Sequence, residues 1–316
     1  MKYSLFSSSG VRVTPIRRSR IGRHEKIEGF CMAIVSFIGF MIFTVFPLVL
    51  SIIVSFNDLH SYELSSMTFV GFGNYVKLFQ NPMFKKAIVN TLLFSLCVPI
   101  NLASQLFLAN LLAKPINKHF AKAARLVLYI PTVIGGLAIS LIWNWILEPN
   151  FGVFNTILSA LGLEKIGFTT TEKWFMPSVL LIKWWSVGMN VLVLEAALAN
   201  VDSTLKEAAR IDGASERTVF FRITLPQISP MLIYTFTTSF IDAVGEMATV
   251  QILSNGGLGP NGAAITLSYL MYRMVNAELF TQGFGVGSAL GLLIGIFTFC
   301  FLEFTNWAVR KWLSFD

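Results

Sequence analysis

Six long apolar segments, separated by short polar ones, dominate the pattern of hydrophobic positions along the chain. Four of them contain no Asp, Glu, Lys or Arg, one is interrupted only by Lys183, and one only by Asp242 and Glu246. The segments are Gly29–Asn57, Ala87–Ala113, Leu126–Leu147, Trp174–Leu194, Pro226–Leu253 and Leu279–Leu302. Each is near or above the roughly 20 residues that a helix needs to cross the hydrocarbon of a bilayer. Because backbone groups in lipid must be satisfied within their own segment, the pattern predicts an all-α polytopic membrane protein with six transmembrane helices.

The first segment is predicted to remain as a spanning helix. It is too long for the apolar region of a signal peptide, and no small-residue cleavage site follows it. Residues 1–28 are then expected to form a basic tail, and residues 29–316 a transmembrane domain that includes a polar loop at 201–228.

Lys and Arg are distributed unequally between the two sides of this six-helix arrangement. Seventeen lie in the N-terminal tail, in the loop after the second segment, in the loop 201–228 and at the C-terminus, whereas six lie in the opposite loops. Cytoplasmic loops carry the excess of Lys and Arg in membrane proteins. We therefore expect both termini and the loop 201–228 to be cytoplasmic.

Composition supports a membrane protein and argues against several functions. The 316-residue chain is 54% hydrophobic and 13% charged, against about 25% charged in a typical globular domain. Its net charge of +7 fits basic cytoplasmic loops, so no nucleic-acid partner is expected. The three histidines lie in separate loops and the three cysteines lack a ligand spacing, so neither a metal site nor a catalytic set is predicted.

The polar loop between the fourth and fifth segments predicts two short helices joined by a turn. Leu205–Ile211 has helical character, and Gly213 suits the left-handed conformation that ends a helix. Ser215 can cap a second helix, and Pro226 stands at the entrance of the fifth segment. From this local pattern alone, a docking surface and an ordinary solvated loop are both open interpretations.

The loop resembles the EAA motif of the inner-membrane permeases of binding-protein-dependent ABC importers. That motif is Glu-Ala-Ala, three residues, Gly, nine residues, then Ile-x-Leu-Pro, and Glu207–Pro226 fits it without a gap. Val70–Leu96 and Ala124–Asn155 are similar to the MalF/UgpA-like carbohydrate branch of the family, as is the C-terminal run FGVGSALGLLIG. One departure is GGLGP at Gly256–Pro260, where that branch often has Gly-Gly-Pro directly.

The resemblance implies a MalF/MetI-like permease fold and a role in the cytoplasmic membrane of a bacterium or archaeon. The chain would be one of two permease subunits, with a MalG-like partner, two ATP-binding cassette subunits and an extracytoplasmic solute-binding protein that delivers a carbohydrate. It would be no enzyme and bind no cofactor itself, because ATP and Mg belong to the ATPase. The residues that the resemblance assigns to ATPase coupling are Glu207, Ala208, Ala209, Arg210, Asp212, Gly213, Ala214, Ile223, Leu225 and Pro226.

Three ionisable residues, Lys183, Asp242 and Glu246, fall inside the apolar segments. Each would cost a few kcal/mol if it faced lipid, so we expect them to face a cavity or each other. Asp242 and Glu246 are four residues apart and are predicted to share a helix face, which requires water, a retained proton or a cation such as Lys183 nearby. A structural pair and a substrate-path lining are both open interpretations.

Aromatic and glycine patterns give two further hypotheses. Trp184 and Trp185 could contact a sugar, but a place in the aromatic belt of the membrane interface explains them as well. Gly287, Gly291 and Gly295 recur every four residues and predict a groove for close helix packing, within this chain or against the partner permease.

An ion-coupled secondary transporter of a small polar solute is the alternative function. It would use paired intramembrane charges such as Asp242 and Glu246. It leaves the motif of the loop 201–228 unexplained.

The predicted topology can be tested by cysteine labelling in a cysteine-free background. A membrane-impermeant reagent applied outside sealed cells should label a cysteine at Ser65 or Gly262, but not one at Ser19 or Ser215. Labelling of position 215 from outside would contradict the six-helix topology.

Overall fold

The structure is a computed structural model that describes residues 23–60, 63–114, 117–276 and 283–313. Most of the predicted basic tail, residues 1–22, lies outside the described residues. The chain divides into two compact units, residues 1–50 and 51–316.

The first unit is one long apolar helix. Its described part consists of α1 (Arg23–Phe40), a π-helical turn η1 (Met41–Val45) and the first half of α2 (Phe46–Ser55), whose second half belongs to the second unit. Phe30–Ser55 is apolar and long enough to cross a membrane. Its large side chains, including Phe37 and Phe43, are exposed. That exposure fits a helix whose environment is lipid or another protein chain.

The second unit is built almost entirely from helices. Its two-residue strands β1 (Asn57–Asp58) and β2 (Thr68–Phe69) pair antiparallel. Its main helices are α3 (Gly73–Gln80), α4 (Pro82–Leu112), α5 (Lys118–Ile134), α6 (Gly136–Ile146), α7 (Val153–Ala160), α8 (Glu172–Trp185), α9 (Gly188–Ala199), α10 (Ser203–Ile211), α13 (Ser229–Val244), α14 (Ala248–Leu253), α15 (Leu267–Val275) and α16 (Gly283–Leu313). The short elements α11 (Glu216–Val219), η3 (Phe220–Thr224) and α12 (Leu225–Gln227) lead into α13.

Three single helices in the described residues are long and apolar enough to span a membrane, and two bent pairs raise the number to five. The single helices are Phe30–Ser55, α4 and the Gly283–Ala308 part of α16. The third apolar segment bends by 104° between α5 and α6, and the fourth bends by 44° between α8 and α9. The fifth segment is divided among α12, α13 and α14, so no single helix in it reaches the length of a span. The start predicted for the sixth, Leu279, lies outside the described residues.

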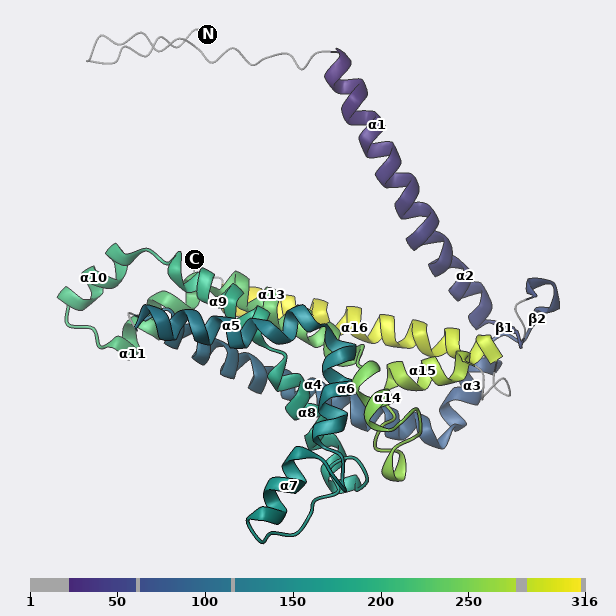
Figure 1. Ribbon diagram of the computed structural model, residues 1–316. Coiled ribbons are helices and arrows are strands. Elements are labelled where there is room, and N and C mark those ends of the chain that lie inside the picture. Colours follow the sequence, from purple (N-terminus) through teal and green to yellow (C-terminus); the bar gives the residue numbers. More distant parts are fainter. Residues whose placement is uncertain (1–22, 61–62, 115–116, 277–282, 314–316) are drawn as a thin grey trace, which may run out of the picture. The chain divides into compact units, whose positions relative to one another are not determined.

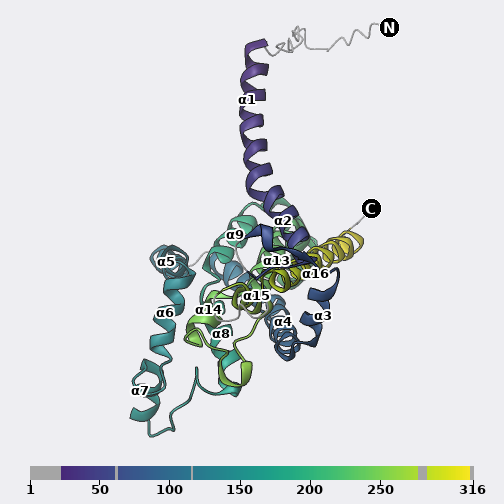
Figure 2. The ribbon, with the colours of Figure 1, turned by 90° about the vertical axis from the view of Figure 1, so that its right-hand side faces the viewer.

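The long helices of the second unit run alongside one another. α4 packs against α9 and α13, and α16 packs against α13 and α15 (Figure 1). The α10–α11 hairpin projects at one end of this bundle, and α3 lies at the other end. Seen along the bundle, α6 and α7 extend to one side (Figure 2).

Two apolar clusters form the core of the second unit. The larger one includes Phe175, Tyr269 and Leu290 and joins α8, α15 and α16. The smaller one includes Leu112 and Leu194 and lies where α4 and α9 approach the hairpin. Apolar packing between α4 and α9 therefore stabilises the end of the bundle from which the hairpin projects.

The glycine stripe of α16 lies partly against α15. A Cβ placed on Gly287 would lie 2.6 Å from Cγ2 of Val275, and one on Gly291 would lie 3.1 Å from Sδ of Met271. A Cβ on Gly295 would have no atom within 4 Å. The first two glycines thus allow close helix contact within the chain, while the third leaves an open surface.

We expect Gly287→Leu to destabilise the isolated subunit by about 1–3 kcal/mol, because the new side chain overpacks the α15–α16 contact. Gly295→Leu is the matched control and should leave the thermal unfolding of the detergent-purified protein unchanged. Equal unfolding temperatures for the two variants would contradict close packing at Gly287.

Candidate functional site

The polar loop folds into a helical hairpin whose ends are capped by its own side chains. The Asp202 carboxylate accepts a hydrogen bond from the Thr204 amide at 2.9 Å and begins α10, and the Ser215 hydroxyl accepts one from the Thr218 amide at 3.2 Å and begins α11. Gly213 joins the two helices with a φ of 81°. The predicted helix, left-handed turn and Ser215 cap are confirmed.

One ion pair closes the hairpin. Nε of Arg210 lies 2.7 Å from Oε1 of Glu216, and Nη2 lies 3.2 Å from Oε2. This contact lowers the pKa of Glu216 and raises that of Arg210. A lowered carboxyl pKa means that the stabilisation is present above the ordinary pKa of glutamate and is lost as the pH falls through the lowered value. The pair therefore remains intact at neutral pH.

The predicted coupling residues divide into an exposed and a partly buried set. The exposed set is Glu207, Ala208, Arg210, Asp212 and Gly213, and the partly buried set is Ala209, Ala214, Ile223, Leu225 and Pro226. The motif therefore exposes its members up to Gly213, apart from Ala209, and partly buries those from Ala214 onward.

The outward surface of the hairpin carries groups without partners. No hydrogen bond or ion pair joins Glu207, Arg217 or Arg222 to any residue that the structure describes. Ile211, which is 86% exposed, and Leu205 are both exposed on α10. The hairpin thus exposes both charged and aliphatic side chains.

The hairpin continues almost without interruption into the bundle. Residues 216–244 are helical except at Ile228, and a π-helical turn, η3, lies within the run. The run ends at Val244, beside the ionisable residues of the apolar segments.

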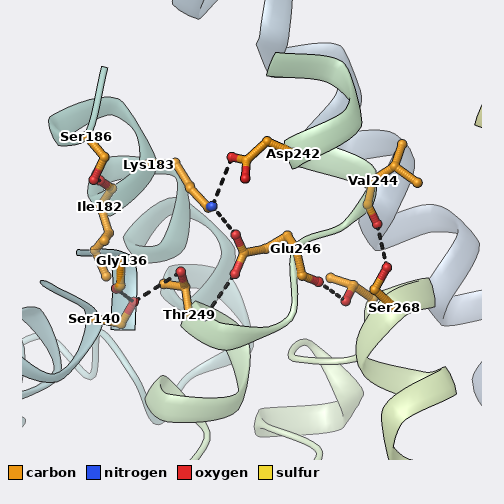
Figure 3. Close-up of polar contacts among 11 residues, drawn as sticks. Gly136, Ser140, Ile182, Lys183, Ser186, Asp242, Val244, Glu246, Thr249 and Ser268 are labelled. Carbon is orange, nitrogen blue, oxygen red and sulfur yellow. Dashed lines mark hydrogen bonds and ion pairs between the residues drawn. The ribbon is translucent and has the colours of Figure 1, made fainter. Parts of the chain in front are cut away.

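Those ionisable residues form one cluster (Figure 3). Nζ of Lys183 lies 3.2 Å from Oδ2 of Asp242 and also contacts Oε2 of Glu246. The side chain of Glu246 is 2% exposed and that of Asp242 is 72% exposed. The prediction that both acids share one helix face is wrong, because α13 ends at Val244 and Glu246 lies in the break before α14.

Glu246 also holds the backbone around that break. Its Oε1 accepts a hydrogen bond from the Thr249 amide at 2.8 Å, and its carbonyl oxygen accepts one from Thr266 Oγ1 at 2.5 Å. Ser140 on α6 lies 3.2 Å from the Thr249 hydroxyl. The break therefore satisfies its polar groups inside the protein, as a membrane span requires.

A polar cavity of about 110 Å³ lies beside the cluster. Lys183 and Asp242 line it together with uncharged polar residues that sequence reasoning missed, namely Asn101, Gln105, Ser186, Asn190 and Ser239. Gln105 is 2% exposed, and its Oε1 has no hydrogen-bond partner among the described residues. The i, i+4 spacing of Asn101 and Gln105 within an apolar helix was the available signal.

The two tryptophans do not line this cavity. Nε1 of Trp184 donates to Ser104 Oγ at 3.1 Å and joins α8 to α4. Trp185 packs edge-on against Trp143, with 6.0 Å between the ring centroids. Both are half-exposed, so the structure places them in helix contacts at the edge of the site.

The sequence profile of the family described as binding-protein-dependent transport system inner membrane component matches residues 105–313. The chain belongs to this family. The predicted resemblance is confirmed, and the match includes both the hairpin and the Lys183 cluster. The family description identifies an inner-membrane component of a transport system.

Several relatives match over most of the chain. The lactose transport system permease protein LacF of Rhizobium radiobacter is 27% identical, over 93% of this chain and 98% of its own length. The arabinooligosaccharides transport system permease protein AraP of Bacillus subtilis is 31% identical, over 81% of this chain and 80% of its own. A chain of a bacterial alginate ABC transporter, crystallised with an alginate pentasaccharide-bound periplasmic protein, has the same fold, with a TM-score of 0.74 at 24% identity over 92% of this chain and 96% of that one.

We expect Lys183→Met to destabilise the isolated subunit by roughly 3–5 kcal/mol, because it leaves the Glu246 carboxylate buried without a cation. The double variant Lys183→Met with Glu246→Gln should lose less than the sum of the two single changes. Asp242→Asn is the control, since this exposed side chain should affect unfolding little. Thermal unfolding of the four variants measures the coupling, and additive losses would contradict a mutually dependent pair.

Proposed function

We propose that this chain is one of two different permease subunits of an ATP-driven importer, and that the loop 201–228 couples it to a separate ATPase. The observation that supports this proposal most strongly is the projecting hairpin. It has the complete EAA spacing in a member of this family, and it exposes charged side chains on its outer surface. A permease without a motor of its own needs such a contact. ATP and Mg²⁺ belong to the ATPase in this proposal, and the chain itself is no enzyme.

The proposed topology has six spans and cytoplasmic termini, with the tail 1–28 followed by a transmembrane domain over 29–316. The distribution of Lys and Arg supports this orientation. The fifth apolar segment, which contains α13 (Ser229–Val244) and α14 (Ala248–Leu253) after the loop, would supply the sixth span as a broken helix. The hairpin then lies at the surface of a bacterial or archaeal cytoplasmic membrane.

The proposed partners are a MalG-like permease, two ATP-binding cassette subunits and an extracytoplasmic solute-binding protein. The transporter of similar fold was crystallised with a periplasmic protein, which supports the last of these. The exposed first helix of the chain and the open surface at Gly295 are faces that a second permease could cover.

The helical run 216–244 provides a mechanical connection in this proposal. An ATPase that moves α10 and α11 would also displace this helical run, whose last residues lie beside Lys183, Asp242 and Glu246. The ion pairs join that end to α8, so the movement would reach the polar cavity lined by Lys183 and Asp242. We infer that the cavity belongs to the substrate path.

We propose a mono- or oligosaccharide as the solute. Relatives with sugar-transport names, among them LacF and AraP, support this class. The cavity offers amide, hydroxyl and charged groups, and the free Oε1 of Gln105 could accept a hydrogen bond from a sugar hydroxyl. Titration of the cognate solute-binding protein with candidate sugars would identify the substrate.

Uptake into proteoliposomes tests the function directly. Solute accumulation should require internal ATP and the loaded binding protein, and should not respond to an imposed proton or sodium gradient. Uptake driven by an ion gradient without ATP would instead establish the alternative, an ion-coupled secondary transporter.

We expect Gly213→Val to leave the protein inserted but to abolish ATPase co-purification or hydrolysis stimulated by the binding protein. A β-branched residue resists the left-handed φ by about 1–2 kcal/mol, which would change the angle between α10 and α11. Gly162→Val is a matched control, because Gly162 has a φ of 75° and, like Gly213, no atom within 4 Å of an added Cβ. Gly162 lies outside the hairpin, so this control should retain coupling.

Bulk on the outer face of α10 provides a second test. Ala208 is exposed, so Ala208→Trp should fold normally and obstruct docking, whereas the partly buried Ala209→Trp would also disturb the hairpin itself. Normal ATPase association and stimulation in both Gly213→Val and Ala208→Trp would mean that the hairpin is not the coupling site.

A further inference from the structure

A second polar cavity, of about 380 Å³, lies between the hairpin and the end of the bundle. Its lining comes from the ends of α4 and α9, from α10, and from the segment α11–η3. It shares no lining residue with the cavity beside Lys183. It is therefore a separate cavity.

Four polar groups without hydrogen-bond partners among the described residues line this cavity. Thr224 is 5% exposed, yet its hydroxyl makes none of the bonds to a preceding carbonyl that helical threonines commonly make. The half-buried amide of Asn110 and the ammonium groups of Lys114 and Lys206 likewise have no hydrogen-bond partner. Lys114 is exposed and Lys206 is half-buried, so water reaches the cavity, and a ligand with acceptor oxygens could replace that water.

The charges and the position of the cavity indicate the chemical class of ligand that it suits. Lys114, Lys206 and Arg210 face a single carboxylate, Glu216, which Arg210 already pairs, so the lining retains positive charge. Leu198 and Phe220 add an apolar wall. Lys114 lies two residues beyond the end of the apolar helix α4 (Pro82–Leu112), and in the proposed topology this position is at the membrane surface. Ammonium, amide and hydroxyl donors beside an apolar wall suit a phosphate group attached to a hydrocarbon chain.

We infer that this cavity binds the phosphate group of an anionic phospholipid and thereby joins α4 to α10. The inference rests on the proposed function only in placing the hairpin at the membrane surface. A bound headgroup would contact Asn110 and Lys114 on the bundle and Lys206 on the hairpin, so the lipid would hold the hairpin in its docking position.

Photo-crosslinking tests this site in the full-length protein, purified with its partner subunits and placed in equimolar phosphatidylglycerol and phosphatidylcholine. Photoreactive phosphatidylglycerol should label the peptides around residues 110–114 and 198–224 in preference to photoreactive phosphatidylcholine. Lys114→Gln with Lys206→Gln should reduce that labelling by roughly tenfold, because two charge-assisted contacts are lost. Thr224→Val should reduce it without changing the charge, and Lys165→Gln with Lys173→Gln is the control that should leave it unchanged.

Equal labelling by the two lipids, or labelling that survives the Lys114 and Lys206 substitutions, would overturn the inference. Inorganic phosphate that protects these peptides in detergent, without preferential labelling by phosphatidylglycerol in the bilayer, would assign the site to a free anion and overturn the lipid source. The readout is independent of ATPase activity, so a failure of the coupling proposal would leave this result interpretable.

Discussion

The burial of one carboxylate, Glu246, is the constraint on which the centre of this protein depends. The fifth apolar segment is interrupted at residues 245–247, where the backbone leaves the helical hydrogen-bond pattern and needs other partners. Glu246 binds the Thr249 amide with its side chain and the Thr266 hydroxyl with its carbonyl, while Lys183 supplies the opposite charge. Four helices, α8, α13, α14 and α15, therefore meet at one residue.

This constraint gives the coupling proposal its physical basis. A helical run that starts at Glu216 on the hairpin ends one residue before Gly245, next to the cluster. Had the fifth segment been a flexible loop, movement of the hairpin would dissipate before it reached the interior. In the proposal, a helix held at one end by ion pairs transmits a displacement that is applied at its other end. The π-helical turn at Phe220–Thr224 is a place in this run where the geometry departs from a regular α-helix.

The sequence predicted the long helices well because apolar length is a strong signal. The second segment corresponds to α4, and the described part of the sixth corresponds to α16. Hydropathy does not show whether a helix axis changes direction, so the 104° bend between α5 and α6 was not predicted, although Gly135 and Gly136 stand at that position. Regular helical spacing likewise predicted Asp242 and Glu246 on one helix face. This prediction failed because the helix breaks between them, and the break depends on contacts to Thr266 and Lys183 that are distant in sequence.

The candidate sites were predictable to different degrees. The helical hairpin followed from residues that act through local geometry, namely Gly213 and the Ser215 cap. The polar cavity did not, because Asn101, Gln105, Asn190 and Ser239 come from three helices and only packing brings them together. Uncharged polar residues also interrupt an apolar pattern too weakly to be noticed singly.

Contact between the hairpin and an ATPase is the claim that most needs direct measurement. A photoreactive amino acid at the exposed Ala208 position, in a transporter that still hydrolyses ATP, reports which chain touches α10. The same probe at Ser159 on α7 serves as the comparison. The proposal predicts an adduct with the ATPase subunit from position 208 and none from position 159, whereas a transporter that couples normally but yields no ATPase adduct at 208 would contradict it.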